Sequence, residues 1–105
     1  MVNMNAAVRQ PMYQALPRGC YIDYSSIAGQ GLFSRSFHEV GAELGMSHLI
    51  IEDEIIRTPL GGFINHSNTP NCEKYKIGDR YYIKTIKPIK PQEELTLRYT
   101  FYSVE

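Results

Sequence analysis

Turn-forming residues interrupt this chain at short intervals from Arg18 onward, and their spacing limits what the chain can fold into. Eight glycines and six prolines in 105 residues separate short runs that favour extended structure. Both residue types break regular elements, because glycine frees the backbone and proline removes a hydrogen-bond donor. No run between them has a helical period of useful length. The sequence therefore predicts a mainly β fold of several small sheets, with one or two helical turns at most.

The expected strands are short and rich in aromatic and branched residues. They cover residues 20–24, 32–37, 43–51, 74–77, 81–86 and 95–101. Gly78-Asp79 is expected to form the two-residue turn of a hairpin. In the last strand, alternation predicts Leu95, Leu97, Tyr99 and Phe101 on one face and Thr96, Arg98 and Thr100 on the other. Glu52-Asp53-Glu54 reads as an acidic loop, and Pro59, Gly61 and Gly62 are expected to break regular structure.

Length and composition indicate one folded domain. A chain of 105 residues has room for one core, and 43% hydrophobic residues argue against disorder. Residues 1–17 have weak periodicity, so we expect a partly flexible N-terminal arm before a folded domain over residues 18–105.

Charge, cysteine content and hydrophobicity indicate the cellular compartment and the classes of partner to expect. Eleven basic residues balance eleven acidic ones, which makes general nucleic-acid binding unlikely on charge grounds alone. With two cysteines, Cys20 and Cys72, we expect free thiols in a reducing compartment. No apolar run approaches membrane-spanning length, and no secretion signal is evident, so we expect an intracellular, soluble protein without a membrane partner.

Three segments contain residue types that suit ligand binding or catalysis. The first contains Gly29-Gln30-Gly31 followed by Leu32 and Phe33, where two glycines allow close approach of backbone to a ligand. Taken alone, this segment is also explained by a plain β-turn.

The second segment runs from Gly61 to Cys72 and concentrates donors and acceptors around Asn65-His66-Ser67. Such side chains also satisfy loop backbone groups without any catalytic role. A metal site made of His66 and Cys72 with His38 or His48 is an alternative, but the spacing matches no zinc pattern. We therefore expect no metal.

The third segment is Glu93-Glu94-Leu95-Thr96 followed by Tyr99. Taken alone, it is explained by an edge strand with aromatic packing. The two glutamates are neighbours on a predicted strand and would point to opposite faces. We therefore assign neither of them a catalytic role.

Taken together and in this order, the three segments resemble the SET domain of protein-lysine methyltransferases. The resemblance spans about Arg18 to Tyr102, and its middle part, Phe63-Ile64-Asn65-His66-Ser67 with Pro70-Asn71-Cys72, is the most specific. The family implies small twisted sheets with a threaded, knot-like C-terminal segment. It also implies transfer of a methyl group from S-adenosylmethionine to a lysine of a protein substrate.

By matching position, the resemblance implies a cofactor pocket made of Gly29, Gln30, Gly31, Leu32, Phe33, Asn65, His66 and Tyr99. The Tyr99 hydroxyl would act as the catalytic group, and Phe101 and Tyr102 would line the substrate channel. The stretch 52–62 is shorter than the corresponding family insert, and Gly62, Leu97 and Arg98 depart from common family residues. By the resemblance, these departures affect the substrate side more than the cofactor side.

Two other functions remain open at this stage. One is a catalytically inactive SET-like module that binds a peptide or partner, as the short insert suggests. The other is a non-enzymatic β-domain that binds nucleic acid through lysines 74, 76, 84, 87 and 90. A domain this small could also form a homodimer to complete its channel.

Overall fold

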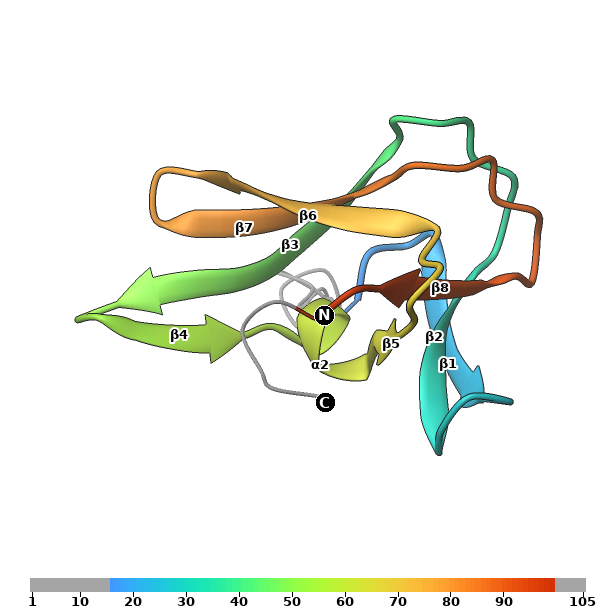
Figure 1. The fold of residues 1–105 in the computed structure, drawn as a ribbon, viewed down its shortest axis with the longest axis horizontal. Coiled ribbons are helices and arrows are strands. Elements are labelled where there is room, and N and C mark those ends of the chain that lie inside the picture. The colour runs from blue at the N-terminus through green and yellow to red at the C-terminus, as the bar shows by residue number, and fades with distance from the viewer. Residues whose placement is uncertain (1–15, 100–105) are drawn as a thin grey trace, which may run out of the picture.

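The computed structural model describes residues 16–99, which form eight strands and one short helix (Figure 1). The elements in chain order are β1 (Cys20–Tyr24), β2 (Gln30–Ser34), β3 (Glu43–Ile51), β4 (Glu54–Arg57), α2 (Pro59–Phe63), β5 (Asn65–His66), β6 (Cys72–Ile77), β7 (Arg80–Thr85) and β8 (Glu94–Leu97). The prediction of a mainly β protein with little helix is confirmed.

The strands form two four-stranded sheets. The first has the order β1-β2-β8-β5 and the second has the order β4-β3-β7-β6. Neighbouring strands are antiparallel except β5 and β8, which run parallel. The parallel pair places residues 65–66 beside a strand that lies about thirty residues later in the chain. A connection of that length is expected, because parallel strands cannot be joined by a tight turn.

The core lies between the sheets and takes side chains from both. Leu32 and Leu95 of the first sheet, Ile83 of the second and Ile89 of a loop are fully buried. Leu60 and Ile64, in and just after α2, are 1% exposed and belong to the same cluster. This shared core fixes the two sheets relative to α2 and β5, from which the polar side chains described below emerge.

Several local predictions hold. β1 and β3 have the predicted bounds, and β6 and β7 are joined at Gly78-Asp79. Gly78 has a φ of 61°, and a positive φ at the first turn residue is the pattern of a type II′ hairpin turn. β2 begins two residues earlier than predicted, because Gln30 and Gly31 already pair with Tyr24 and Asp23.

The expected acidic loop at Glu52-Asp53-Glu54 is wrong in part. Glu52 and Asp53 form a two-residue turn with φ values of 49° and 69°, and Glu54 begins strand β4. Positive φ at both turn positions is the pattern of a type I′ turn, whose twist matches that of the flanking strands. The sequence lacks the glycine that usually marks such a turn, which is why β4 was not predicted.

The expected break at residues 59–62 is also wrong, because these residues form α2. Thr58 caps the helix by accepting a hydrogen bond from the Gly61 N–H (3.3 Å), and Pro59 occupies the first turn, where its missing N–H costs nothing. The Thr58 hydroxyl lies 2.7 Å from the Met46 carbonyl and donates to β3. A Cβ on Gly61 would overlap the Ser47 carbonyl, so this glycine allows the helix to lie against β3.

The last strand differs from the predicted pattern. Leu95, Thr96 and Leu97 are all buried, since β8 lies between β2 and β5 and is covered on both faces. The strand ends at Leu97, and the residues from Thr100 onward lie outside the described part. The threading of the C-terminal segment stays a prediction, as does the N-terminal arm, of which Leu16 packs against the core.

Both cysteines are free thiols within the core. Burial raises the pKa of Cys20 to about 11 and that of Cys72 to about 12. Both thiols therefore stay protonated at neutral pH, and neither is poised as a nucleophile. Separately, no helix within residues 16–99 has the length and hydrophobicity required to cross a bilayer.

We predict that His48 makes the protein less stable in mild acid. Its side chain is buried on β3, and burial, followed by the charges of Lys74 and Arg57, lowers its pKa to about 4. Since an unfolded histidine titrates near 6.5, the unfolded chain binds more protons between about pH 4 and pH 6.5. The free energy of unfolding should therefore fall as pH drops through this window.

Urea denaturation at several pH values measures this effect. His48→Gln should flatten the pH dependence between pH 4 and pH 6.5, whereas His38→Gln, which keeps His48, should retain it. An unchanged slope in His48→Gln would show that other groups cause the loss.

Candidate functional site

The Asn65 side chain lies where β5 meets the loop between β1 and β2. Its Nδ2 atom is within hydrogen-bond distance of four oxygens, namely Glu94 Oε2 (2.8 Å), Ser25 Oγ (3.1 Å), Ala28 O (3.2 Å) and Gln30 O (3.3 Å). Four surrounding acceptors fix which end of the amide carries the hydrogens. Asn65 therefore holds the 25–31 loop against β8.

Ser25 and Glu94 complete this network. The Ser25 hydroxyl lies 2.8 Å from the Glu94 carboxylate and accepts the Ile27 N–H at 2.9 Å. The Ser25 N–H donates to the Gly29 carbonyl at 2.9 Å, which closes the loop on itself. Hydrogen bonds to an ionised carboxylate are stronger than neutral ones, so Glu94 is a firm anchor for the loop.

Gly31 is required by the closeness of these groups. A Cβ at this position would overlap the Glu94 carboxylate and would lie 3.0 Å from Asn65 Nδ2. Gly29 has a different role, because its φ of 44° lies in the left-handed region and nothing lies near its Cβ position. The two glycines of the predicted loop thus serve close packing and turn formation respectively.

The network leaves one atom of Asn65 for a ligand. Its Nδ2 group is used internally, and no described residue donates a hydrogen bond to its Oδ1 atom. Gly29 and Gln30 beside it are exposed. The arrangement therefore offers a fixed carbonyl oxygen next to an accessible loop, which suits a cationic or N–H donor group.

His66 joins β5 to the end of β8. Its Nδ1 atom accepts the Tyr99 N–H at 3.0 Å, and its Nε2 atom lies 3.1 Å from Asn68 Oδ1. A ring nitrogen that accepts from a backbone N–H carries no proton in the neutral ring, so Nε2 holds the proton and donates to Asn68. The His66 and Tyr99 rings are 5.1 Å apart between centroids. The histidine thereby positions the backbone of Tyr99.

The Tyr99 hydroxyl points back to the same segment. It donates to the Ile64 carbonyl at 2.8 Å, one residue before Asn65. A hydroxyl has one proton to donate and two lone pairs with which it can accept hydrogen bonds. Residues 64–66 and Tyr99 therefore form one polar site whose main-chain parts are held by β5 and β8.

Asn71 fixes β8 from its other side. Its Oδ1 accepts the Thr96 N–H at 2.8 Å, and its Nδ2 donates to the Glu94 carbonyl at 2.8 Å. Asn71 is 7% exposed. The interpretation of polar residues in this motif as partners for backbone groups is thus right for Asn71.

The other predicted site residues lie in different surroundings. Leu32 is in the core, and Phe33 stacks on Tyr21 with 5.7 Å between ring centroids, so neither side chain joins the Asn65 network. Phe101 and Tyr102 lie outside the described residues. Among residues 16–99, no cluster of three or more His, Cys, Asp or Glu side chains is arranged to hold a metal ion.

Glu94 is the residue whose position in the site the sequence did not predict. Glu93 and Glu94 bind different partners, as alternation suggested, with Glu93 Oε2 on Asn71 Nδ2 (3.2 Å) and Glu94 on Ser25 and Asn65. The available signal was its place within the third segment. Its partners lie 29 and 69 positions earlier, a separation that no local pattern reveals.

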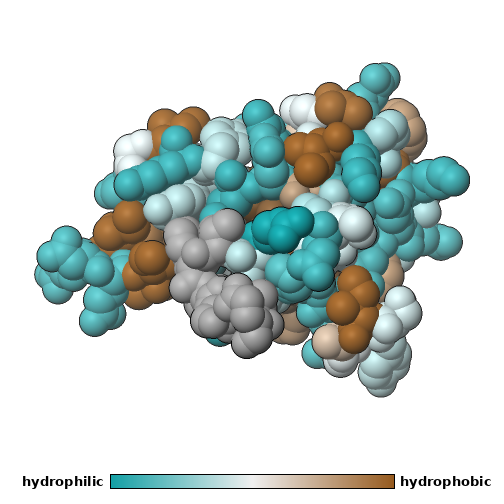
Figure 2. Space-filling model, viewed as in Figure 1, coloured by the Kyte–Doolittle hydropathy of each residue, from teal (hydrophilic) through white to brown (hydrophobic). Residues whose placement is uncertain are grey.

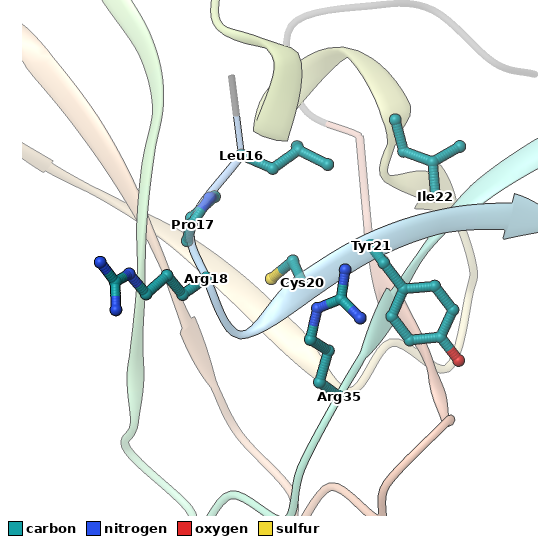
Figure 3. A pocket seen from close by; sticks show the side chains of 7 residues that line it. All are labelled: Leu16, Pro17, Arg18, Cys20, Tyr21, Ile22 and Arg35. Atoms are coloured by element: carbon teal, nitrogen blue, oxygen red, sulfur yellow. The ribbon is translucent and has the colours of Figure 1, made fainter. Parts of the chain in front are cut away.

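A separate pocket of about 580 Å³ lies at the start of β1, away from this network (Figure 3). Its lining residues are Leu16, Pro17, Arg18, Cys20, Tyr21, Ile22 and Arg35. The Arg35 guanidinium lies 5.0 Å from the centre of the Tyr21 ring, and Arg18 points in another direction. The pocket shares no lining residue with the Asn65 network.

Comparison with known proteins agrees with this geometry. The model of the SET domain family matches residues 4–100, which is most of the chain. The chain belongs to the SET domain family. A solved Plasmodium falciparum protein, named as a "putative histone methyltransferase", superposes with a TM-score of 0.67 at 19% identity, covering 86% of this chain and 100% of that chain. At that identity the likeness establishes the SET fold alone. No curated protein sequence is significantly similar to the chain.

We predict that Gly31→Ala destabilises this SET domain, whereas Gly62→Ala does not. The added methyl group at residue 31 must displace the Glu94 carboxylate from Asn65 and Ser25, and overpacking of this kind costs about 1–3 kcal/mol. At Gly62, which lies in α2, nothing lies within 4 Å of a Cβ, so alanine should be neutral or slightly stabilising. Chemical denaturation of both variants measures the difference. Equal stability of the two would show that the loop and Glu94 move apart without cost.

Proposed function

We propose that this SET domain is an S-adenosylmethionine-dependent protein-lysine methyltransferase. The observation that carries the proposal is the convergence of all three motif segments at one place. Asn65 holds the glycine loop to Glu94, while Tyr99 contacts both His66 and the Ile64 carbonyl. Polar side chains from three distant parts of the sequence thus meet at one place, which supports a ligand site there.

The oxygen atoms of the site suit S-adenosylmethionine, which carries a positive sulfonium and a positive ammonium group. Asn65 Oδ1, the Ile64 carbonyl and the Tyr99 hydroxyl are all acceptors. We assign Asn65 to the ammonium group and the backbone of residues 29–31 and of His66 to the rest of the cofactor. When bound, the cofactor supplies the methyl group; the residues of the chain hold and orient the reactants.

Tyr99 is proposed to orient the substrate amine. Its hydroxyl is held in place by the bond that it donates to the Ile64 carbonyl, and we assign its oxygen the role of accepting an N–H from the lysine. Free lysine has a pKa near 10.4, so the neutral amine must be favoured by burial of the side chain in an apolar channel. With the oxygen atoms fixed, alignment of the amine with the methyl group is then the main contribution of the protein.

Phe101 and Tyr102 remain the proposed walls of the substrate channel, and a lysine-bearing protein is the proposed partner. The alternative is a SET domain that binds a peptide or partner without transferring methyl groups. Transfer of labelled methyl groups from S-adenosylmethionine to proteins of a cell lysate distinguishes the two. Labelled lysine, identified by mass spectrometry, is the result expected for the enzyme.

We predict that Asn65→Ala weakens S-adenosylmethionine binding by about 1.5–3 kcal/mol, which is typical of losing a hydrogen bond to a charged group. Calorimetric titration of the folded variant measures the affinity. The control is Asp79→Ala, which removes an exposed side chain in the β6–β7 turn, outside this network, and should change affinity little.

Because Asn65 also holds the loop, Ser25→Ala separates the two roles. It removes a hydroxyl from the loop network and leaves Asn65 Oδ1 in place. If Ser25→Ala weakens binding as much as Asn65→Ala does, loop order rather than the Oδ1 atom determines affinity.

We predict that Tyr99→Phe leaves a folded protein that binds S-adenosylmethionine but transfers methyl groups about a hundredfold to a thousandfold more slowly. The variant keeps the ring beside His66 and removes only the hydroxyl. If the hydroxyl acts in the reacting complex, turnover should fall while cofactor affinity is kept.

Single-turnover transfer with thermal melts measures this effect. The control is Tyr82→Phe, since Tyr82 lies on β7 in the other sheet, outside the Asn65 network. Near-normal transfer by a stable Tyr99→Phe protein would remove Tyr99 from the mechanism.

A further inference from the structure

The Glu94 carboxylate carries a negative charge that no cation among residues 16–99 balances. Its oxygens each lie 2.8 Å from the Ser25 hydroxyl, and one of them accepts from Asn65 Nδ2 at 2.8 Å, so both donors are neutral. Neither of the ion pairs formed by the described residues includes Glu94. The side chain is half-buried. A charge withdrawn from water without a counter-charge is costly, and a cation that binds beside it lowers that cost.

This carboxylate lies directly behind two parts of the proposed cofactor pocket. One is the amide of Asn65, to which it is hydrogen-bonded. The other is the backbone of Gly31, where an added Cβ would overlap Glu94 Oε2. Figure 2 shows mainly hydrophilic surface over β5, the strand that begins with Asn65. The charge of Glu94 therefore acts on the same polar site that the cofactor is proposed to occupy.

The Asn65 amide connects this charge to the ligand side of the site. Its Nδ2 group donates to the carboxylate and to loop carbonyls, whereas no described residue donates to its Oδ1 atom. Hydrogen bonds in series polarise one another, so donation to a carboxylate makes the amide oxygen a stronger acceptor. A cationic ligand at this oxygen would be attracted by the polarised amide and also directly by Glu94.

We propose that Glu94 makes the site select its ligand by positive charge, so that S-adenosylmethionine is held more tightly than S-adenosylhomocysteine, the product that remains after methyl transfer. The two molecules share an ammonium and a carboxylate group and differ at sulfur, which is a sulfonium in the first and a neutral thioether in the second. The inference rests on the proposed function and deepens it, because it assigns a residue to the release of the spent cofactor.

Methyl transfer changes the charge that Glu94 attracts. The lysine nitrogen forms a bond to the methyl carbon as the sulfur–carbon bond breaks, and the electron pair of the broken bond stays on sulfur. The positive charge thus passes from sulfur to the methylated nitrogen, which belongs to the protein substrate. The product left in the site has no net charge, so its attraction to the carboxylate is weaker. Since product release limits turnover in many enzymes, weaker product binding favours the next cycle.

Calorimetric titration of the full chain with each of the two ligands tests the proposal. The quantity to compare is the ratio of the two Kd values, because damage to the loop that weakens both ligands equally cancels in this ratio. The wild-type chain should bind S-adenosylmethionine more tightly. Glu94→Gln keeps an acceptor oxygen and removes the charge, so it should reduce this preference about tenfold.

Two control variants separate the charge from the hydrogen-bond network. Ser25→Ala removes a hydroxyl from the same network and keeps the charge of Glu94, so the ratio should stay at the wild-type value even if both affinities fall. Glu93→Gln removes the neighbouring carboxylate, which bonds to Asn71 and the Lys90 N–H rather than to Asn65. The ratio in this variant should also stay close to the wild-type value.

One measurement needs no variant and so does not depend on the fold of Glu94→Gln. The wild-type chain should bind the cofactor analogue in which a carbon bearing an ammonium group replaces the sulfonium more tightly than it binds S-adenosylhomocysteine. Equal binding of charged and neutral ligands by the wild type, or an unchanged ratio in folded Glu94→Gln, would overturn the charge selection and leave the proposed function standing. A chain that binds none of these ligands would overturn both.

Discussion

The hydrogen bond between Asn65 and Glu94 links the side chains of two strands, β5 and β8, at the point where both meet the glycine loop. β5 has only two residues, and its parallel pairing with β8 gives it few backbone bonds. The carboxylate of Glu94, at the first residue of β8, adds a charged acceptor to which both Asn65 and Ser25 donate. This contact fixes the glycine loop, the β5 segment and β8 in one arrangement, and the position of Tyr99 follows from it through His66.

Some residues of the middle motif belong to the candidate site, and others support the backbone of the fold. Asn65 and His66 face the loop and Tyr99, whereas Asn71, six residues after Asn65, serves the backbone of β8. Burying a polar residue such as Asn71 is costly unless its hydrogen bonds are satisfied, and here both ends of its amide are used. The dense polar composition of this segment therefore has two physical causes, a ligand site and the satisfaction of a central strand.

Local pattern predicted those elements whose stability is local. β3 has its predicted bounds because its leucines and isoleucines lie between turn-forming residues at both ends, and Gly78-Asp79 determined the β6–β7 turn. β4 was missed because Ile55 and Ile56 are both exposed, so no alternation marks the strand. β5 and the role of Glu94 were missed because both depend on partners tens of residues away. The family motif identified Asn65, His66 and Tyr99, but only the structure shows which of their atoms are already used.

The atoms that are already used within the fold limit which residues can take part in catalysis. The Asn65 Nδ2 group, the His66 ring nitrogens and the Glu94 carboxylate all have partners within the fold. Removing any of them disturbs the loop or β8, so their effects on activity and on stability are coupled. The Tyr99 hydroxyl differs, because it bonds to the main-chain carbonyl of Ile64, just before β5, and not to the 25–31 loop or β8. A hydroxyl whose position is fixed by a main-chain carbonyl suits the task of orienting an amine, and this reasoning makes Tyr99 the residue on which the proposed chemistry depends.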